Sequence, residues 1–281
     1  MSTTFSGIVE FGPGFEPRPE LSHVVFDFDG TLSLIRAGWP EVMLPMFVEM
    51  FPSSPESTPE ADRQMLYDDM MELTGKQTIY QMIRFAERIR ERGGQPLDPL
   101  DYKHEYLRRL DLKIKDRHEI LTRQPERRDE FLVFNTIEML ELLKNAGMNL
   151  YLASGTDEPF VKKEAAMLGI DHYFGHHIYG AQDDYKSFSK KMVIERILRE
   201  NNINGRNLIG FGDGYVEIEN TKETGGFAVA VASDEDHNGS GNMDPWKRER
   251  LARVHADVFI PDYRDITPLM KVITGQSPQP A

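Results

Sequence analysis

The sequence of 281 residues contains no cysteine. Disulfide bonds, zinc sites built from thiolates and catalysis by a cysteine nucleophile are therefore excluded. Long hydrophobic runs are also missing, because no stretch approaches the roughly 20 apolar residues that a membrane-spanning helix requires. The first 20 residues have no apolar segment flanked by basic residues, which argues against a secretory signal peptide. From these absences we expect a cytoplasmic protein without a membrane anchor.

Positive charge is scarce, since 33 Lys and Arg stand against 46 Asp and Glu and leave a formal net charge of −13. Such a chain is repelled by nucleic acids and anionic membranes unless it has a strong basic patch. The basic clusters at 127–128 and 247–250 are short and interleaved with acids. We therefore expect no nucleic-acid partner and no membrane partner. A small anionic substrate remains compatible, because a metal ion or a few oriented amides can reverse the field locally.

The composition, with 40% hydrophobic and 28% charged residues, is typical of a folded globular protein. The length corresponds to about two domains of roughly 150 residues. Residues 1–20 contain several glycines and prolines and predict an irregular arm, whereas residues 34–130 show helical spacing and no strong strand pattern. Within this second region the pattern predicts helices over 39–51, 59–73, 78–92 and 98–121.

Beyond residue 130, short apolar runs alternate with helical patterns, which predicts parallel strands with right-handed crossovers. Together with the run at 23–28, strands are predicted at 148–153, 178–179, 207–211, 227–232 and 258–260. Helices are predicted at 129–145, 158–168 and 189–201. The expected organisation is an α/β domain, residues 21–33 and 131–275, interrupted by an all-helical domain at 34–130. Residues 1–20 form an arm and residues 276–281 a tail.

Ligands bind at the carboxyl ends of the strands in such sheets, so the residues that follow each strand are the candidate site. Those residues are Asp27, Asp29 and Thr31, then Ser154 and Gly155, then Asp213 and Glu217. Two like charges about 4 Å apart repel by roughly 4 kcal/mol at an effective dielectric of about 20, so clustered carboxylates need protons or a cation. Oxygen ligands of this kind favour Mg²⁺, which also keeps waters and takes substrate phosphate.

Asp27 and Asp29 are separated by one residue at a strand end, so their side chains point to the same side. This geometry would let Asp27 attack a phosphorus atom while Asp29 moves a proton. An aspartyl phosphate is an established type of covalent intermediate. The hydroxyl of Ser154 and the amides around Gly155 could donate to anionic oxygens, and the helix that opens at Ser189 adds a lysine.

Four segments, in this order, resemble the four signatures of the haloacid dehalogenase superfamily. They are Asp27-Phe28-Asp29-Gly30-Thr31-Leu32, Ser154 after the run 150–153, a lysine at a helix start, and Gly212-Asp213 with Glu217 four residues on. The resemblance covers residues 21–270 approximately and implies a Rossmann-like core. The insert resembles the helical cap of the subgroup that contains phosphoglycolate phosphatases and β-phosphoglucomutase.

The resemblance implies a role for each matching residue. Asp27 would be the nucleophile and a Mg²⁺ ligand, and Asp29 the general acid and base, with its backbone carbonyl also on the metal. Thr31 would hold either the transferred phosphoryl group or the loop. Ser154 and Gly155 would bind the phosphoryl group. Asp213 would bind the metal, and Glu217 would bind it directly or through water. Members that cleave carbon–halogen bonds lack the second acid, so Asp29 indicates phosphomonoester chemistry.

Two lysine assignments are open at the sequence level. Lys190 begins the predicted helix as the family pattern requires, but Lys186 and Lys191 compete for the same role. In the insert, Lys76 belongs to a Thr74-Gly75-Lys76 segment between two helices. That segment is either a simple turn or a loop that carries Lys76 to the substrate when the cap closes.

The sequence thus predicts a Mg²⁺-dependent phosphatase that acts on a small phosphorylated metabolite, such as a sugar phosphate. A sugar phosphomutase of the β-phosphoglucomutase type is the alternative on the same scaffold. A non-enzymatic module with a vestigial site is disfavoured by the intact acids. The sequence does not indicate the substrate or the oligomeric state.

Overall fold

A computed structural model describes residues 5–276, and its centre is a seven-stranded sheet with the order β1-β7-β6-β5-β2-β3-β4. The strands are β1 (Glu10–Phe11), β2 (His23–Phe26), β3 (Asn149–Asp157), β4 (Ile178–Ala181), β5 (Leu208–Gly212), β6 (Phe227–Val231) and β7 (Val258–Ile260). All neighbouring strands are parallel except β1, which pairs antiparallel with β7. The predicted α/β class is therefore confirmed.

Strand β2 lies in the middle of the sheet, between β5 and β3, and all four of its residues are buried. Val24 and Phe26 pack in the large core, whereas Val25 joins a separate cluster with Tyr151 and Ile194. This alternation explains the continuous apolar run, because a strand covered on both faces needs no polar side. The residues that follow β2 are thereby held at a fixed point of the sheet edge.

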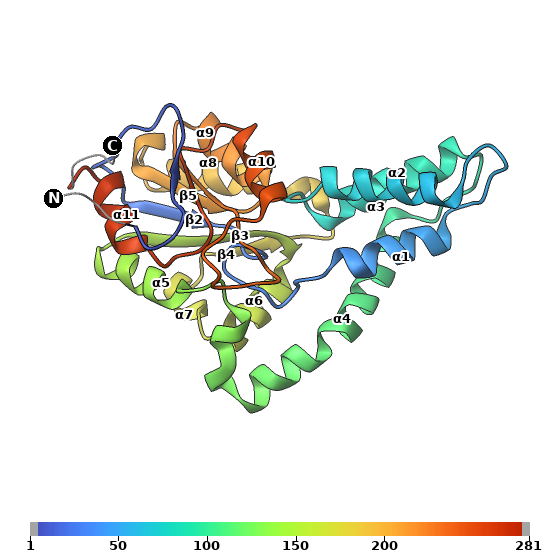
Figure 1. Ribbon diagram of the computed structural model, residues 1–281, viewed down its shortest axis with the longest axis horizontal. Coiled ribbons are helices and arrows are strands. Elements are labelled where there is room, and N and C mark those ends of the chain that lie inside the picture. Colours follow the sequence, from blue (N-terminus) through green and yellow to red (C-terminus); the bar gives the residue numbers. More distant parts are fainter. Residues whose placement is uncertain (1–4, 277–281) are drawn as a thin grey trace.

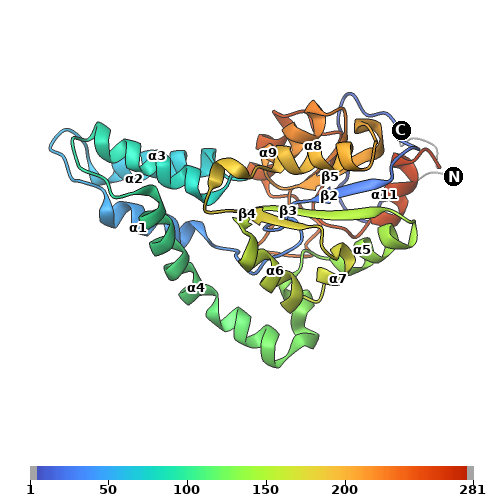
Figure 2. The same cartoon turned by 180° about the vertical axis from the view of Figure 1, so that it is seen from behind.

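Helices cover both faces of the sheet (Figures 1 and 2). On one side lie α8 (Lys190–Glu200) and α9 (Tyr215–Glu223), and on the other lie α5 (Thr136–Asn145), α6 (Glu158–Met167) and α7 (Asp171–Phe174). Two further helices, α10 (Pro245–Ala252) and α11 (Ile266–Ile273), follow β6 and β7. Within residues 5–276, no helix combines the length and apolar character that crossing a membrane would require.

The helical insert projects from the sheet as an elongated group of helices (Figure 1). It consists of α1 (Pro40–Met50), α2 (Pro59–Glu72), α3 (Thr78–Glu91) and the long α4 (Pro99–Arg123). These helices confirm the four predicted ones with small shifts at their ends. Thr58 and Asp98 cap α2 and α4 with their side chains, and a proline occupies the first turn of each helix. Phe47 and Phe85 stack in the core of the insert with ring centroids 4.1 Å apart.

Two local predictions differ from the structure. The helix expected to start at residue 129 begins only at Thr136, because residues 125–131 form a 3₁₀ helix and Leu132 pairs with Ser33. This pairing brings the two connections between sheet and insert together. The arm at 1–20 is not wholly irregular, since its residues Glu10–Phe11 form the edge strand β1.

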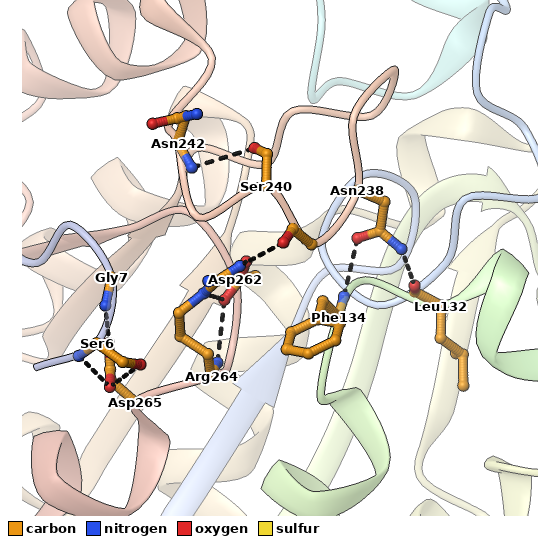
Figure 3. Close-up of polar contacts among 11 residues, drawn as sticks. Ser6, Gly7, Leu132, Phe134, Asn238, Ser240, Asn242, Asp262, Arg264 and Asp265 are labelled. Atoms are coloured by element: carbon orange, nitrogen blue, oxygen red, sulfur yellow. Dashed lines mark hydrogen bonds and ion pairs between the residues drawn. The ribbon is translucent and has the colours of Figure 1, made fainter.

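The loop between β6 and α10 is fastened to the second of these connections (Figure 3). The side-chain amide of Asn238 donates to the carbonyl of Leu132 at 2.8 Å, and its oxygen accepts from the amide of Phe134 at 3.0 Å. Arg264 donates to the carbonyl of Gly239 at 2.8 Å. The loop therefore has a fixed place beside the carboxyl ends of the strands.

Candidate active site

A cavity of about 100 Å³ lies where the carboxyl ends of the central strands meet the helical insert. The core contributes Asp27, Asp29, Ser154, Gly155, Lys190 and Asp213 to its wall, and the insert contributes Gly75, Lys76 and Gln81, among others. Residues far apart in the sequence are thus brought together as predicted. Thr31 and Glu217 stand behind the wall and reach the cavity through their neighbours.

Asp27 directly follows β2, and only 5% of its surface is exposed. Burial raises the pKa of Asp27, and the charge of Asp213 adds to this effect, whereas the ammonium of Lys190 opposes it. The Nζ atom of Lys190 lies 2.8 Å from Asp27 Oδ1 and also contacts Glu217. Asp27 is therefore a buried carboxylate that depends on nearby positive charge to stay ionised.

The structure distinguishes the three candidate lysines. Lys190 is the first residue of α8, whose start is capped by the Ser189 hydroxyl, and it is buried beside Asp27. Lys191 points to the surface and pairs with Glu223, and Lys186 is exposed. Among them, only Lys190 lines the cavity.

Asp29 is held differently from Asp27. The hydroxyl of Thr156 donates to Asp29 Oδ2 at 2.7 Å, and Arg36 Nε lies 3.9 Å from Oδ1. Burial raises the pKa of Asp29 to about 7, although the charge of Arg36 opposes the shift. The side chain keeps 28% of its surface exposed at the cavity. A carboxyl that titrates near neutrality can both donate and accept a proton there.

Arg36 was not singled out by the sequence, and neither was its partner Glu164. The guanidinium donates twice to Glu164, with Nε and Nη2 at 3.0 and 2.8 Å from the two carboxylate oxygens. Glu164 is fully buried on α6, and His118 of α4 lies 3.4 Å from it. The position before α1 that Arg36 occupies has no sequence feature that marks it as a site residue.

Ser154 and Gly155 lie in the last part of β3, where its pairing with β4 is irregular and where it faces the insert. The hydroxyl of Ser154 is buried and accepts a hydrogen bond from the amide of Thr156 at 3.0 Å. A Cβ atom on Gly155 would stand 2.7 Å from the carbonyl oxygen of Lys76, so only glycine allows the insert to approach this closely. The segment around Lys76 is therefore both an interhelix turn and part of the cavity wall. The Lys76 side chain itself is exposed.

Asp213 follows β5 and is held through Thr31, which lies in the loop after β2. Its amide donates to the hydroxyl of Thr31 at 3.0 Å, and the carbonyl of Thr31 accepts from the Tyr263 hydroxyl at 2.9 Å. Thr31 therefore contacts the loop that carries Asp213, which is the second of the two roles expected for it. Lys247 of α10 lies 2.9 Å from Asp213 Oδ2. In the sequence Lys247 stands out only as part of a short basic cluster.

The donor set can be compared with the needs of a divalent cation. Among residues 5–276, no group of three or more His, Asp or Glu side chains is arranged to hold a metal ion. Asp27 and Asp213 are nevertheless close enough for the charge of Asp213 to raise the pKa of Asp27. Two carboxylates fit Mg²⁺, which takes one or two of them together with water and substrate phosphate. Glu217 instead contacts Lys190.

Comparison with known proteins defines the class. Residues 21–219 match the family model for haloacid dehalogenase-like hydrolases, and the chain belongs to this family. It is therefore a hydrolase with the Rossmann-like core and helical cap that the resemblance implied. No curated protein shows a significant sequence match.

Solved structures with the same fold are distant in sequence. A predicted phosphoglycolate phosphatase from Haemophilus somnus is 16% identical over 89% of this chain and 98% of its own, with a TM-score of 0.58. A β-phosphoglucomutase from Clostridium difficile is 13% identical over 91% and 98%, with a TM-score of 0.61. A predicted phosphatase from Clostridium acetobutylicum is 16% identical over 91% and 99%, with a TM-score of 0.57. These similarities show the fold.

Proposed function

We propose that this hydrolase is a Mg²⁺-dependent phosphatase that cleaves a small phosphomonoester through an aspartyl-phosphate intermediate. The observation that carries the proposal is the pair of acids in one cavity with different surroundings. Asp27 lies against the ammonium of Lys190, whereas Asp29 has a pKa of about 7 and a hydrogen bond from Thr156. Two carboxyls with such different environments suit the roles of nucleophile and proton carrier.

In the first step, a carboxylate oxygen of Asp27 attacks phosphorus, and the bond from phosphorus to the substrate oxygen breaks. Asp29 gives its proton to the leaving oxygen, so a neutral alcohol departs. In the second step, Asp29 removes a proton from water, and that water attacks phosphorus of the phosphoaspartate. The acyl-phosphate bond breaks, which releases inorganic phosphate and restores Asp27 and the protonated Asp29.

Charge on the transferred phosphoryl group must be balanced during both steps. Lys190 Nζ already lies 2.8 Å from Asp27 Oδ1 and can contact a phosphoryl oxygen next to it. The Ser154 hydroxyl and the amide of Gly155 line the same cavity and can donate to the other oxygens. We assign Asp27, Asp213 and the backbone carbonyl of Asp29 as candidate ligands of the cation, which would supply further positive charge when bound. Glu217 is proposed to orient Lys190 and to reach the cation through water.

The insert is proposed to act as a cap domain that comprises residues 34–130. Its two connections meet at the Ser33–Leu132 pair, which supports a boundary at this point. The close approach of the Lys76 carbonyl to Gly155 makes the insert part of the cavity wall, where it can face a bound substrate. Lys76 is the candidate for contact with the substrate from the cap. Closure excludes water that would otherwise compete with the ordered reaction.

Turnover of p-nitrophenyl phosphate by the purified protein tests the proposal. We expect release of p-nitrophenol with Mg²⁺, loss of activity with a chelator, and no turnover by Asp27→Asn. Asp111→Asn is the matched control, because Asp111 is exposed on α4. An Asp27→Asn protein that keeps full turnover would contradict the assignment. Incubation with a hexose 1-phosphate separates the two candidate reactions, since a phosphatase releases phosphate and a phosphomutase yields an isomer.

A further inference from the structure

Lys247 is a buried lysine beside the active-site cavity with no role in the reaction described above. Its side chain is 11% exposed, and its Nζ lies 2.9 Å from Asp213 Oδ2 and 2.6 Å from Glu235 Oε1. Nζ also donates to the hydroxyl of Ser233 at 3.0 Å. The ammonium is thus charged and fully coordinated.

This ammonium is packed directly against the loop that carries the two catalytic acids. A Cβ atom on Gly30 would stand 2.1 Å from Asp213 Oδ2 and 3.0 Å from Lys247 Nζ. The Ser233 hydroxyl, which accepts from Lys247, donates in turn to the carbonyl of Gly30 at 2.5 Å. The absence of a side chain at Gly30 is therefore what lets Asp213, Lys247 and the loop meet.

The surroundings of Lys247 are held in place from several sides. Ser233 and Glu235 lie in the loop after β6, which Asn238 fastens to the second connection of the cap (Figure 3). Lys247 is itself within the first turn of α10, where its amide donates to the capping side chain of Asp244. Lys247 does not line the cavity, so it acts through Asp213 rather than on a substrate.

Two buried lysines, one in the cavity wall and one behind it, therefore have different partners. Lys190 contacts Asp27 and Glu217, whereas Lys247 contacts Asp213 and Glu235. A cation that binds to Asp27 and Asp213 would share the Asp213 carboxylate with the ammonium of Lys247, which already contacts Oδ2. The positive charge of Lys247 repels that cation, and its hydrogen bond orients the carboxylate that receives it.

We propose that Lys247 is a positioning residue, an internal cation that holds Asp213 in place in the metal-free protein and weakens the binding of the divalent cation. The inference rests on the proposed function, because it requires that a divalent cation binds at Asp213. It predicts that the loss of Lys247 makes the fold depend on the cation, since Asp213, which is 11% exposed, and the half-buried Glu235 would then lack their positive partner.

Thermal unfolding and calorimetric titration of metal-free protein with Mg²⁺ test this role without the use of activity. In Lys247→Met we expect a lower melting temperature without Mg²⁺ and a larger rise on addition of Mg²⁺ than in the wild type. The Mg²⁺ concentration for half-saturation should fall by about tenfold or more, because one nearby positive charge is lost. Lys222→Met is the matched control, since Lys222 pairs with the buried Asp257 at 2.7 Å outside the cavity.

A second variant changes the charge in the opposite direction. Glu235 is 23% exposed, so Glu235→Gln should fold. Asp213 would then be the one carboxylate in contact with Lys247. We expect weaker Mg²⁺ binding and a smaller Mg²⁺-induced rise in melting temperature. If Lys247→Met does not fold, Lys247→Gln takes its place, because its amide can keep a hydrogen bond to Asp213 while the positive charge is removed, and tighter Mg²⁺ binding is again expected.

The possible outcomes distinguish the role of Lys247 from the proposed function. Opposite shifts in Lys247→Met and Glu235→Gln, with Lys222→Met at the wild-type value, support the inference. A wild-type protein that binds Mg²⁺ while all variants bind it equally well overturns the role of Lys247 and leaves the proposed function intact. A wild-type protein that shows no Mg²⁺ binding overturns both.

Discussion

The guanidinium of Arg36 joins the acid Asp29 to the fully buried carboxylate of Glu164. Removal of the carboxylate in Glu164→Ala leaves Arg36 buried without its main partner. We expect a loss of about 3–5 kcal/mol in the free energy of unfolding, measured by urea denaturation. Glu200→Ala is the control, because its pair with Arg196 is about half exposed and should contribute less than about 0.5 kcal/mol. Equal losses in the two variants would contradict the importance of the buried pair.

The same pair predicts a pH dependence of stability. Burial alone would raise the pKa of Glu164, but contact with His118 and the charge of Arg36 lower it below the ordinary value of 4.5. Below about pH 4.5 the unfolded chain therefore binds a proton at Glu164 before the folded protein does. The stabilisation is complete above that pH and is lost as the pH falls through the lower folded-state pKa.

Urea denaturation of the wild type and Glu164→Gln between neutral and acidic pH measures this effect. The difference in unfolding free energy between the two proteins should shrink below about pH 4.5, where Glu164 becomes protonated first in the unfolded chain. A difference that stays constant to lower pH would mean that Glu164 titrates alike in the folded and unfolded states.

The proposed role of Asp29 as proton carrier predicts different effects on two substrates. In Asp29→Asn the leaving group receives no proton, so an alkyl phosphate should lose about 10²–10⁴ in rate. p-Nitrophenolate leaves without a proton, so its release should occur once per enzyme and then slow, because no base activates the water. Rapid mixing of this variant with p-nitrophenyl phosphate should show such a burst. Equal slowing of both substrates without a burst would argue against Asp29 as the proton carrier.

The central part of the site is predictable from the sequence because it follows the sheet. Asp27, Ser154 and Asp213 each come directly after a short apolar run, and parallel strands bring such positions to one edge. No knowledge of the rest of the molecule is needed for this step. Lys190 was one of three candidates in the sequence, and its burial beside Asp27 at the capped start of α8 distinguishes it in the structure.

The supporting residues are not predictable in this way, because their burial depends on distant segments. Lys247 stands in a run of charged residues that is typical of a solvated helix, yet it is buried by contact with Asp213. Arg36 is similarly fixed by Glu164, which is distant in the sequence. The predicted start of α5 at residue 129 is wrong for the same reason, since the pairing of Leu132 with Ser33 overrides the local helical pattern.

Neighbouring lysines on α8 offer a matched pair of variants. Lys190 contacts Asp27 inside the cavity, whereas Lys191 pairs with Glu223 on the surface. Loss of one preorganised donor to a developing negative charge costs about 10²–10³ in kcat, so Lys190→Met should lose activity by this factor. Lys191→Met should keep wild-type kcat in the same phosphatase assay. Similar activity in both variants would contradict the assignment of Lys190.

Arg250 of α10 connects the core to the cap. Its guanidinium donates to the carbonyls of Met71, Glu72 and Thr74 at the end of α2, with the last two at 2.6 and 3.2 Å. The rings of Tyr215 and Trp246 lie 4.8 and 5.0 Å from it. Because Arg250 donates to three backbone carbonyls of the segment just before Lys76, we infer that it holds the loop that carries Lys76 against the cavity.

Arg250→Ala should therefore loosen this loop without unfolding the sheet. Hydrogen bonds to a charged group contribute about 1.5–3 kcal/mol, so amide hydrogen exchange in residues 73–77 should accelerate by about tenfold or more. Exchange in β2 and β5 should stay unchanged, and KM for the phosphate ester should rise because the cap no longer rests on Gly155. Arg253→Ala, which removes an exposed pair with Glu249, is the control. Unchanged exchange in 73–77 would show that the cap is held by other contacts.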